Sequence, residues 1–262
     1  MCRLAAYIGP PVPLSALLYD APRSLYEQAV EPCEPGGPNR INVDGTGIAW
    51  WDGQDPRPLR YRTDRPPWAD ENLSGLASRI TAGTQLAAVR SASTGIPYGI
   101  EFSHPFVHGD LAGTHNGVIG QFRAVLARPL LARLPDHLFS AFGGMSDSLA
   151  IFLLAVAQWE RDPAGGLAGA LRGALTAVGE ECARAGSTAK LNVALAHASG
   201  VAVVKSGYGE LGNSLYVLCD GARWPGASIV ASEPLDSDSG WTLVPDRHIV
   251  TATRDGIDIA AC

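Results

Sequence analysis

The stretch Met1-Cys2-Arg3-Leu4-Ala5-Ala6-Tyr7-Ile8 places a cysteine beside the initiator methionine and follows it with an apolar run. Leu4 to Ile8 is typical of a short buried strand, which Gly9-Pro10 is expected to end. Removal of Met1 would give Cys2 both a thiol, with a reference pKa of about 8.5, and an α-amine, at about 7.7–8.0. Such a residue can act as its own base-activated nucleophile. On these residues alone, a small residue packed in an early strand is the favoured interpretation.

The composition of the 262-residue chain is that of a soluble globular protein, with 46% hydrophobic and 18% charged residues. Its longest apolar run, residues 149–157, is too short to span a membrane. We expect no signal peptide. A net charge of −6 argues against nucleic-acid and anionic-membrane partners. The five cysteines are scattered and form no C-x-x-C pair, so we expect no disulfide framework, no metal and no cofactor, in a reduced cytoplasmic setting.

Strand patterns occupy both ends of the chain and helix patterns the middle. A Gly-rich turn at 42–47 leads into a strand from Ile48, and a helix over 72–81 precedes a buried strand over 85–90. A strand over 111–119 is followed by helices over 121–132, 146–160 and 166–185. From residue 190 onward, strands are predicted at 191–197, 201–205, 214–219, 228–231, 247–253 and 256–260. This order predicts an α+β architecture in which helices cover one or two sheets.

Three polar clusters could serve a Cys2 nucleophile. Residues 90–95 begin with an arginine that could clamp a carboxylate. Within 114–119, the Asn116 amide and the Gly117 N–H could stabilise an oxyanion. Within 146–148, an aspartate could receive an ammonium group. Taken singly, each has a simpler explanation: a solvated arginine, an Asn-Gly hairpin turn and a helix cap, respectively.

Together, these motifs resemble the class II, or N-terminal-nucleophile, glutamine amidotransferases. The resemblance runs nearly end to end and rests on seven motifs in one order: Cys2, then residues 42–47, 89–91, 103–106, 115–119, 146–148 and 231–234. It implies a four-layer αββα sandwich with two antiparallel sheets between helical layers, which agrees with the strand–helix–strand order. It also implies that residues 1–262 form a single amidotransferase domain.

The resemblance implies a mechanism through a thioester. Cys2 would be the nucleophile and its α-amine the general base, while the Asn116 side chain and the Gly117 N–H would form the oxyanion hole. Attack on a γ-carbonyl would give a γ-glutamyl thioester, and its hydrolysis would release glutamate.

The resemblance also implies how the substrate is held. Arg90, helped by Ser93 and Thr94, would bind the α-carboxylate of a γ-glutamyl group, and Asp147 would bind its α-ammonium. The partner is thus a small γ-glutamyl molecule; the oligomeric state, including a homo-oligomer, stays open.

The Met-Cys-Arg start, the Val-Arg-Ser-Ala clamp at 89–92 and the Ser-Glu-Pro stretch at 232–234 resemble one branch of the family more closely. Members of that branch are stand-alone γ-glutamyl hydrolases of ergothioneine biosynthesis, which act on γ-glutamyl-hercynylcysteine sulfoxide. Arg3 departs from the glycine common in ammonia-consuming synthases. A glutaminase subunit serving a separate synthase, a γ-glutamyl deprotection enzyme of another pathway and an inactive scaffold on the same fold remain alternatives.

Other polar and aromatic residues could contribute to such a site. A trimethylammonium leaving group could be held by aromatic faces, for which the candidates are Trp50, Trp51, Trp68 and Tyr98, although core packing is favoured for each. His104 and His115 lack metal-ligand spacing and are expected to make structural hydrogen bonds. Asn42 and Asp44 are expected to brace the Gly-rich turn.

Overall fold

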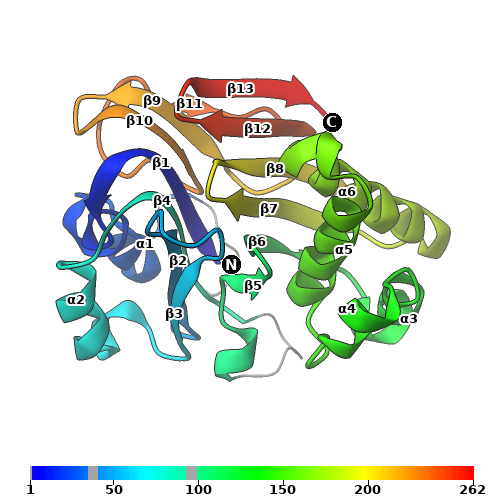
Figure 1. Cartoon of the computed structure of the whole chain (residues 1–262). Coiled ribbons are helices and arrows are strands. Elements are labelled where there is room, and N and C mark those ends of the chain that lie inside the picture. The colour runs from blue at the N-terminus through cyan, green and yellow to red at the C-terminus, as the bar shows by residue number, and fades with distance from the viewer. Residues whose placement is uncertain (1, 35–40, 93–98) are drawn as a thin grey trace.

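The computed structural model describes residues 2–34, 41–92 and 99–262, and within them two antiparallel sheets stack face to face between helical layers (Figure 1). The seven-stranded sheet has the order β11-β9-β10-β1-β4-β2-β3, and the six-stranded sheet has the order β13-β12-β8-β7-β6-β5. All strand pairs within the described residues are antiparallel. The predicted α+β αββα sandwich is confirmed.

The strands of the two sheets come from both ends of the chain. The larger sheet contains β1 (Arg3–Pro13), β2 (Thr46–Trp51), β3 (Leu59–Thr63), β4 (Thr81–Val89), β9 (Tyr216–Gly221), β10 (Trp224–Ala231) and β11 (Thr242–Leu243). The smaller sheet contains β5 (Phe106–His108), β6 (Leu111–Ile119), β7 (Ala189–His197), β8 (Gly200–Tyr208), β12 (His248–Thr253) and β13 (Gly256–Ala261).

The helices form the two outer layers. On the larger sheet lie η1 (Ala16–Asp20), α1 (Leu25–Val30), η2 (Pro67–Ala69) and α2 (Glu71–Ala77), and on the smaller sheet lie η4 (Phe122–Leu126), α3 (Ala127–Leu131), α4 (Asp136–Ser140), α5 (Asp147–Arg161), η5 (Pro163–Gly165) and α6 (Gly166–Ala185). A short turn, η3 (Ile100–Phe102), precedes β5. None of the helices in the described part of the chain combines the length and apolar character needed to cross a membrane.

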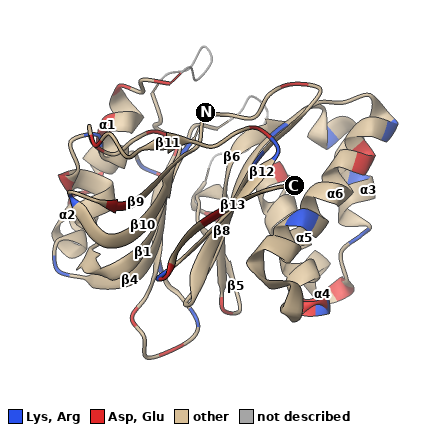
Figure 2. Ribbon diagram, turned by 90° about the horizontal axis from the view of Figure 1, so that it is seen from above, with Lys and Arg blue, Asp and Glu red and all other residues tan. Residues whose placement is uncertain are grey.

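Three apolar clusters correspond to the three interfaces of the sandwich. One joins the larger sheet to its helices, one joins the smaller sheet to α3–α6, and the third lies between the sheets. The third contains Leu4, Leu86 and Ala194, so even-numbered residues of β1 face the smaller sheet. Seen from above, charged residues lie on the outer helices and loops and also on some strands, among them β9 and β13 (Figure 2).

Several predicted element boundaries are wrong: β4 begins at Thr81, β8 continues to Tyr208 and β10 begins at Trp224. Two further errors, in β1 and α2, have a clear physical cause. β1 continues to Pro13 instead of ending at Gly9, because a register shift between Ile8 and Val12 takes Pro10 and Pro11 out of the regular ladder and pairing with β4 resumes at Val12. The helix predicted over 72–81 ends at Ala77. Thr81 already belongs to β4, where it pairs with Pro13 of β1. Pairing with β1 therefore overrides the helical spacing at Ile80.

Candidate active site

Cys2 directly precedes the central strand β1, and its side chain faces the space between the sheets. The side chain follows the alternation set by Leu4, which packs in the inter-sheet core. The Cys2 Sγ donates to the Ser91 main-chain oxygen at 3.6 Å, and only 8% of the residue is exposed. β4 and β10 pair with β1 on its two sides, so residues after Val89 and after Ala231 flank the thiol.

Arg90 is held on the β4 side of Cys2 by the predicted Gly-rich turn. The Arg90 N–H donates to the Gly45 oxygen at 2.8 Å, and the Asp44 N–H donates back to the Arg90 oxygen at 3.0 Å. The Asp44 carboxylate accepts from the Ala92 N–H at 2.7 Å, and the Arg90 guanidinium lies 5.9 Å from the centre of the Phe102 ring. Its position therefore suits a substrate carboxylate clamp. Ser93 and Thr94, the predicted helpers of Arg90, lie outside the described residues.

The turn at 42–47 depends on glycine because another segment approaches it closely. A Cβ on Gly47 would lie 2.1 Å from the His104 oxygen, and Gly45 has φ of +145°. The turn leads into β2 as predicted. The bracing predicted for Asp44 is confirmed, whereas Asn42 contributes through its main-chain N–H to the Ala29 oxygen, and its buried side chain makes no hydrogen bond in the described part of the chain.

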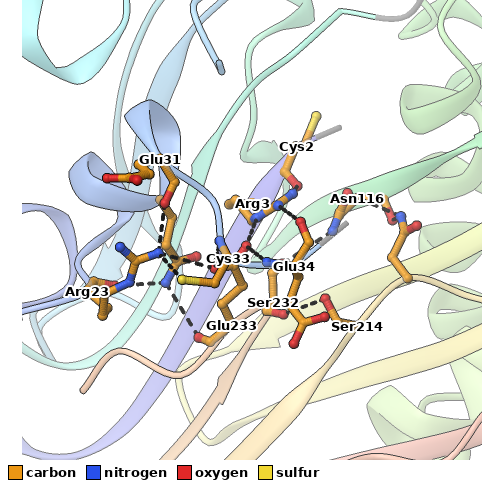
Figure 3. A network of polar contacts seen from close by, with 12 residues as sticks. Cys2, Arg3, Arg23, Glu31, Cys33, Glu34, Asn116, Ser214, Ser232 and Glu233 are labelled. Atoms are coloured by element: carbon orange, nitrogen blue, oxygen red, sulfur yellow. Dashed lines mark hydrogen bonds and ion pairs between the residues drawn. The ribbon is translucent and has the colours of Figure 1, made fainter. Parts of the chain in front are cut away.

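Asn116 and Gly117 lie inside β6, so the alternative of a hairpin turn is wrong. Asn116 pairs with Asn192 of β7, and its side chain faces the inter-sheet space on the same side as Ala112. The Asn116 Nδ2 donates to the Ser232 Oγ at 3.3 Å, and the same oxygen accepts from the Leu4 N–H at 3.0 Å. One hydroxyl thus connects the predicted oxyanion amide to the strand that carries Cys2 (Figure 3).

Asp147 begins α5, and Ser146 caps that helix by accepting from the Leu149 N–H, as predicted. One carboxylate oxygen of Asp147 accepts from the Ile119 N–H at 2.9 Å, and the other accepts from the Ser148 N–H at 2.8 Å. Asp147 therefore ties the start of α5 to the end of the strand that carries the Asn116-Gly117 pair.

The two histidines near these motifs are buried and structural, as predicted. The His115 Nε2 lies 3.0 Å from the Lys190 oxygen, which can only accept, so Nε2 carries the proton and Nδ1 accepts from the Ser148 hydroxyl at 3.0 Å. Burial lowers the pKa of His115, partly offset by the Asp147 carboxylate. Burial, together with His115 and two arginines, holds the pKa of His104 well below 6.5. In the described residues, no group of three or more His, Cys, Asp or Glu side chains is placed to hold a metal.

A buried ion pair behind Cys2 joins two motifs from opposite ends of the chain. The Arg3 Nε lies 2.7 Å from the Glu233 Oε1, and both side chains are buried. Arg3 also donates to the Cys2 oxygen at 3.1 Å, while Glu233 accepts from the main-chain N–H groups of Cys33 and Glu34 (Figure 3). The sequence contained both motifs but gave no signal that they pair.

The three described candidates for an aromatic cage pack against other parts of the protein. Trp50 packs in the core under the helices, and Trp68 packs edge-on against Tyr26 in the helical layer. Trp51 faces the other sheet, but it lies far from Cys2. It pairs with Thr84, which pairs in turn with Ile8, and Ile8 is about 20 Å from Cys2 along β1. Core packing, the simpler interpretation, therefore holds for Trp50 and Trp51. Tyr98 lies outside the described residues.

Two antiparallel sheets between helical layers, with a cysteine at the start of a central strand, define the N-terminal-nucleophile amidotransferase class. A solved class II glutamine aminotransferase domain protein from Silicibacter pomeroyi superposes with a TM-score of 0.69 and 25% identity over 99% of both chains. The allosteric regulatory enzyme of purine biosynthesis shares the fold at a TM-score of 0.66 and 14% identity, over 99% of this chain and 49% of that one. No protein-family model matches the sequence.

This chain belongs to the class II glutamine amidotransferase family. It is 32% identical to the γ-glutamyl-hercynylcysteine sulfoxide hydrolase of Mycobacterium tuberculosis over 100% of this chain and 97% of that protein. The protein of the same name from Mycolicibacterium smegmatis is also 32% identical, over 95% of each chain.

Proposed function

We propose that this protein hydrolyses the γ-glutamyl amide of hercynylcysteine sulfoxide, or of a closely similar amine, through a thioester on Cys2. The observation that carries the proposal is the arrangement around the thiol: β4 brings the buried Arg90 beside Cys2, and Ser232 joins the Asn116 amide of the facing sheet to the start of β1. The full-length similarity to γ-glutamyl-hercynylcysteine sulfoxide hydrolases supports the identity of the leaving amine.

The reaction requires removal of Met1. The α-amine of Cys2 then takes the thiol proton, and the thiolate attacks the γ-carbonyl carbon. The Asn116 Nδ2 and the Gly117 N–H stabilise the resulting oxyanion. Collapse of the tetrahedral intermediate breaks the C–N bond, and the α-ammonium returns its proton to the departing amine.

The second half of the reaction regenerates the enzyme. The α-amine of Cys2 takes a proton from a water molecule as that water attacks the thioester carbon. When the C–S bond then breaks, the α-ammonium of Cys2 returns this proton to the thiolate, and glutamate is released. Throughout both halves of the reaction, Arg90 binds the α-carboxylate of the glutamyl group and Asp147 binds the α-ammonium of the same glutamyl group. The fixed γ-glutamyl half therefore places the scissile amide at the thiol.

A glutamate-release assay across a panel of γ-glutamyl amides tests this function, with Cys2→Ala as the control. We expect turnover of γ-glutamyl-hercynylcysteine sulfoxide to exceed turnover of free glutamine, and the control to be inactive. Intact-mass measurement should show a mature chain lacking Met1 and, on rapid quenching, a γ-glutamyl adduct. High glutaminase activity that rises with an added synthase would instead establish an ammonia-supplying subunit.

A further inference from the structure

An oxyanion hole built from an asparagine depends on which end of the amide faces the reacting atom. The NH2 end donates hydrogen bonds and stabilises a developing negative charge, whereas the carbonyl end repels it. The two ends have nearly the same shape, so packing alone does not choose between them. Neighbouring hydrogen-bond partners must make that choice.

Around Asn116, the partner that makes the choice is Asn213, in the loop between β8 and β9. The Asn213 Nδ2 donates to the Asn116 main-chain oxygen at 3.0 Å and to the Asn116 Oδ1 at 3.3 Å. On its other side, the Asn116 Nδ2 donates to the Ser232 Oγ at 3.3 Å. At most 8% of any of these three residues is exposed, so water offers little replacement for a lost partner.

A rotated Asn116 amide would fail at Asn213 in particular. Rotation by 180° would bring the Asn116 NH2 against the Asn213 NH2, which is a contact between two donors. The Ser232 hydroxyl can donate or accept, so it tolerates either orientation. Among the described side chains that hydrogen-bond to the Asn116 amide, only Asn213 separates the two orientations.

We infer that Asn213 is a positioning residue that sets the orientation of the oxyanion-hole amide, with Ser232 anchoring that amide to β1. This inference rests on the proposed role of Asn116 in catalysis. The Asn213 loop is itself held in place, because the Asn192 Nδ2 donates to the main-chain oxygens of Asn213 and Ser214 at 3.2 and 2.8 Å. The Ser214 hydroxyl in turn donates to the Ser232 main-chain oxygen at 2.9 Å.

The order of two substitutions at position 213 distinguishes orientation from packing. Asn213→Asp keeps the shape but replaces the donor with an acceptor, so it favours the rotated Asn116 amide, with its carbonyl toward the oxyanion. Asn213→Ala removes the preference and leaves a small gap. We expect Asp to lower kcat about 100-fold and Ala about 10-fold, with KM changed less than about 3-fold in both. A role in packing alone predicts the reverse order.

Two further variants complete the test. In an Asn116→Ala background, Asn213→Asp should cause no additional loss of kcat, because the amide that it orients is gone. Asn192→Ala tests the support of the loop: it removes the two hydrogen bonds to the main-chain oxygens of Asn213 and Ser214 but leaves the Asn213 side chain in place, so it should lower thermal stability and reduce kcat less than Asn213→Asp does. Full activity of Asn213→Asp, or additive losses in the double variant, would overturn the inference.

A measurement without a leaving amine separates this inference from the proposed function. A glutamine-like diazoketone would alkylate Cys2: a bond forms between Sγ and the diazo carbon, the thiol proton moves to that carbon, and N2 departs. Its ketone oxygen would occupy the oxyanion hole, so Asn213→Asp should slow adduct formation, followed by intact mass, about 100-fold. If the unsubstituted enzyme is alkylated but does not hydrolyse the amides, the amine is misassigned and position 213 is still tested. If it does neither, both proposals fail.

Discussion

Gly117 illustrates how little space surrounds the predicted oxyanion hole. A Cβ at this position would lie 1.9 Å from the Lys190 oxygen on β7 and 2.4 Å from the His115 Nε2. The Lys190 atom is backbone and the His115 ring is buried, so neither can move aside cheaply. The glycine is therefore required by strand packing as well as by any use of its N–H.

We predict that Gly117→Ala lowers the free energy of unfolding by about 1–3 kcal/mol, the usual cost of overpacking. Turnover should fall further than this stability loss explains, because β6 must shift away from β7. Urea unfolding and kcat together measure both effects. Gly75→Ala is the control: nothing lies within 4 Å of its Cβ in α2, and it should be neutral or slightly stabilising. An active, stable Gly117→Ala enzyme would contradict the packing described above.

The buried neutral histidines should make the protein sensitive to mild acid. Burial lowers the pKa of His115 in the folded state, whereas the unfolded chain titrates near 6.5. At a pH between these two pKa values, the His115 side chain is protonated in the unfolded state but neutral in the folded state. The contribution of neutral His115 to the free energy of unfolding is therefore fully present above pH 6.5 and is lost as pH falls.

The expected result is a drop in unfolding free energy between pH 7.5 and 5.5, and a shallower drop for His115→Gln. Gln can still donate to the Lys190 oxygen but does not titrate. Urea unfolding of both proteins at several pH values gives the two slopes. Parallel slopes would show that His115 does not contribute.

At the scale of elements, a buried ion pair joins the start of β1 to the segment that follows β10. Arg3 and Glu233 are buried together, and Glu233 also organises the main chain at Cys33 and Glu34. A buried pair of this kind is costly to break, because without Arg3 the buried Glu233 keeps, among the described residues, only the longer ion pair with Arg23, at 3.6 Å.

Arg3→Met should destabilise the fold by about 3–5 kcal/mol, and the Arg3→Met/Glu233→Met double variant by less than the sum of its parts. Thermal and denaturant unfolding measure both terms. Arg57→Met provides a matched control at the exposed Asp55–Arg57 pair, where little change is expected. Strict additivity in the double variant would show that the pair is not coupled.

Element prediction succeeded where local pattern and tertiary context agree. The helix over 166–185 matches α6, and the strand over 111–119 matches β6. Prediction failed at β1, where pairing with β4 resumes at Val12 beyond a register shift, and at the end of α2. The short strands β5 and β11 carry too few residues for a periodic pattern.

At the scale of the whole molecule, the inter-sheet core holds together segments from the beginning and end of the chain. Leu86 of β4 is fully buried in this cluster, alongside residues of β8 and β12. Because both sheets contribute to one core, we expect residues 1–262 to unfold as one unit.

Leu86→Ala should therefore lower the unfolding free energy by about 2–5 kcal/mol while the transition stays single. Far-UV circular dichroism and tryptophan fluorescence should report coincident midpoints. Leu76→Ala on the exposed side of α2 is the control and should change little. Two resolved transitions would show that the sheets unfold separately.

The ordered motifs predicted the fold and the candidate site residues, because each motif is a local pattern. They did not identify the partners that fix those residues. Asn213 lies in an ordinary polar turn, and Ser232 and Glu233 stood in a motif with no assigned partner. Hydrogen bonds between distant strands depend on register, which no local pattern encodes.

The contacts around Cys2 join residues that are made at very different times during synthesis of the chain. The Leu4 N–H and the Ser232 hydroxyl are separated by 228 positions, and Arg3 and Glu233 by 230. During synthesis, the thiol is therefore made long before the groups that anchor its strand. A chain that stops short of Ser232 carries the proposed nucleophile without a complete site, so reactivity toward γ-glutamyl amides should arise only after Ser232 and Glu233 have been added.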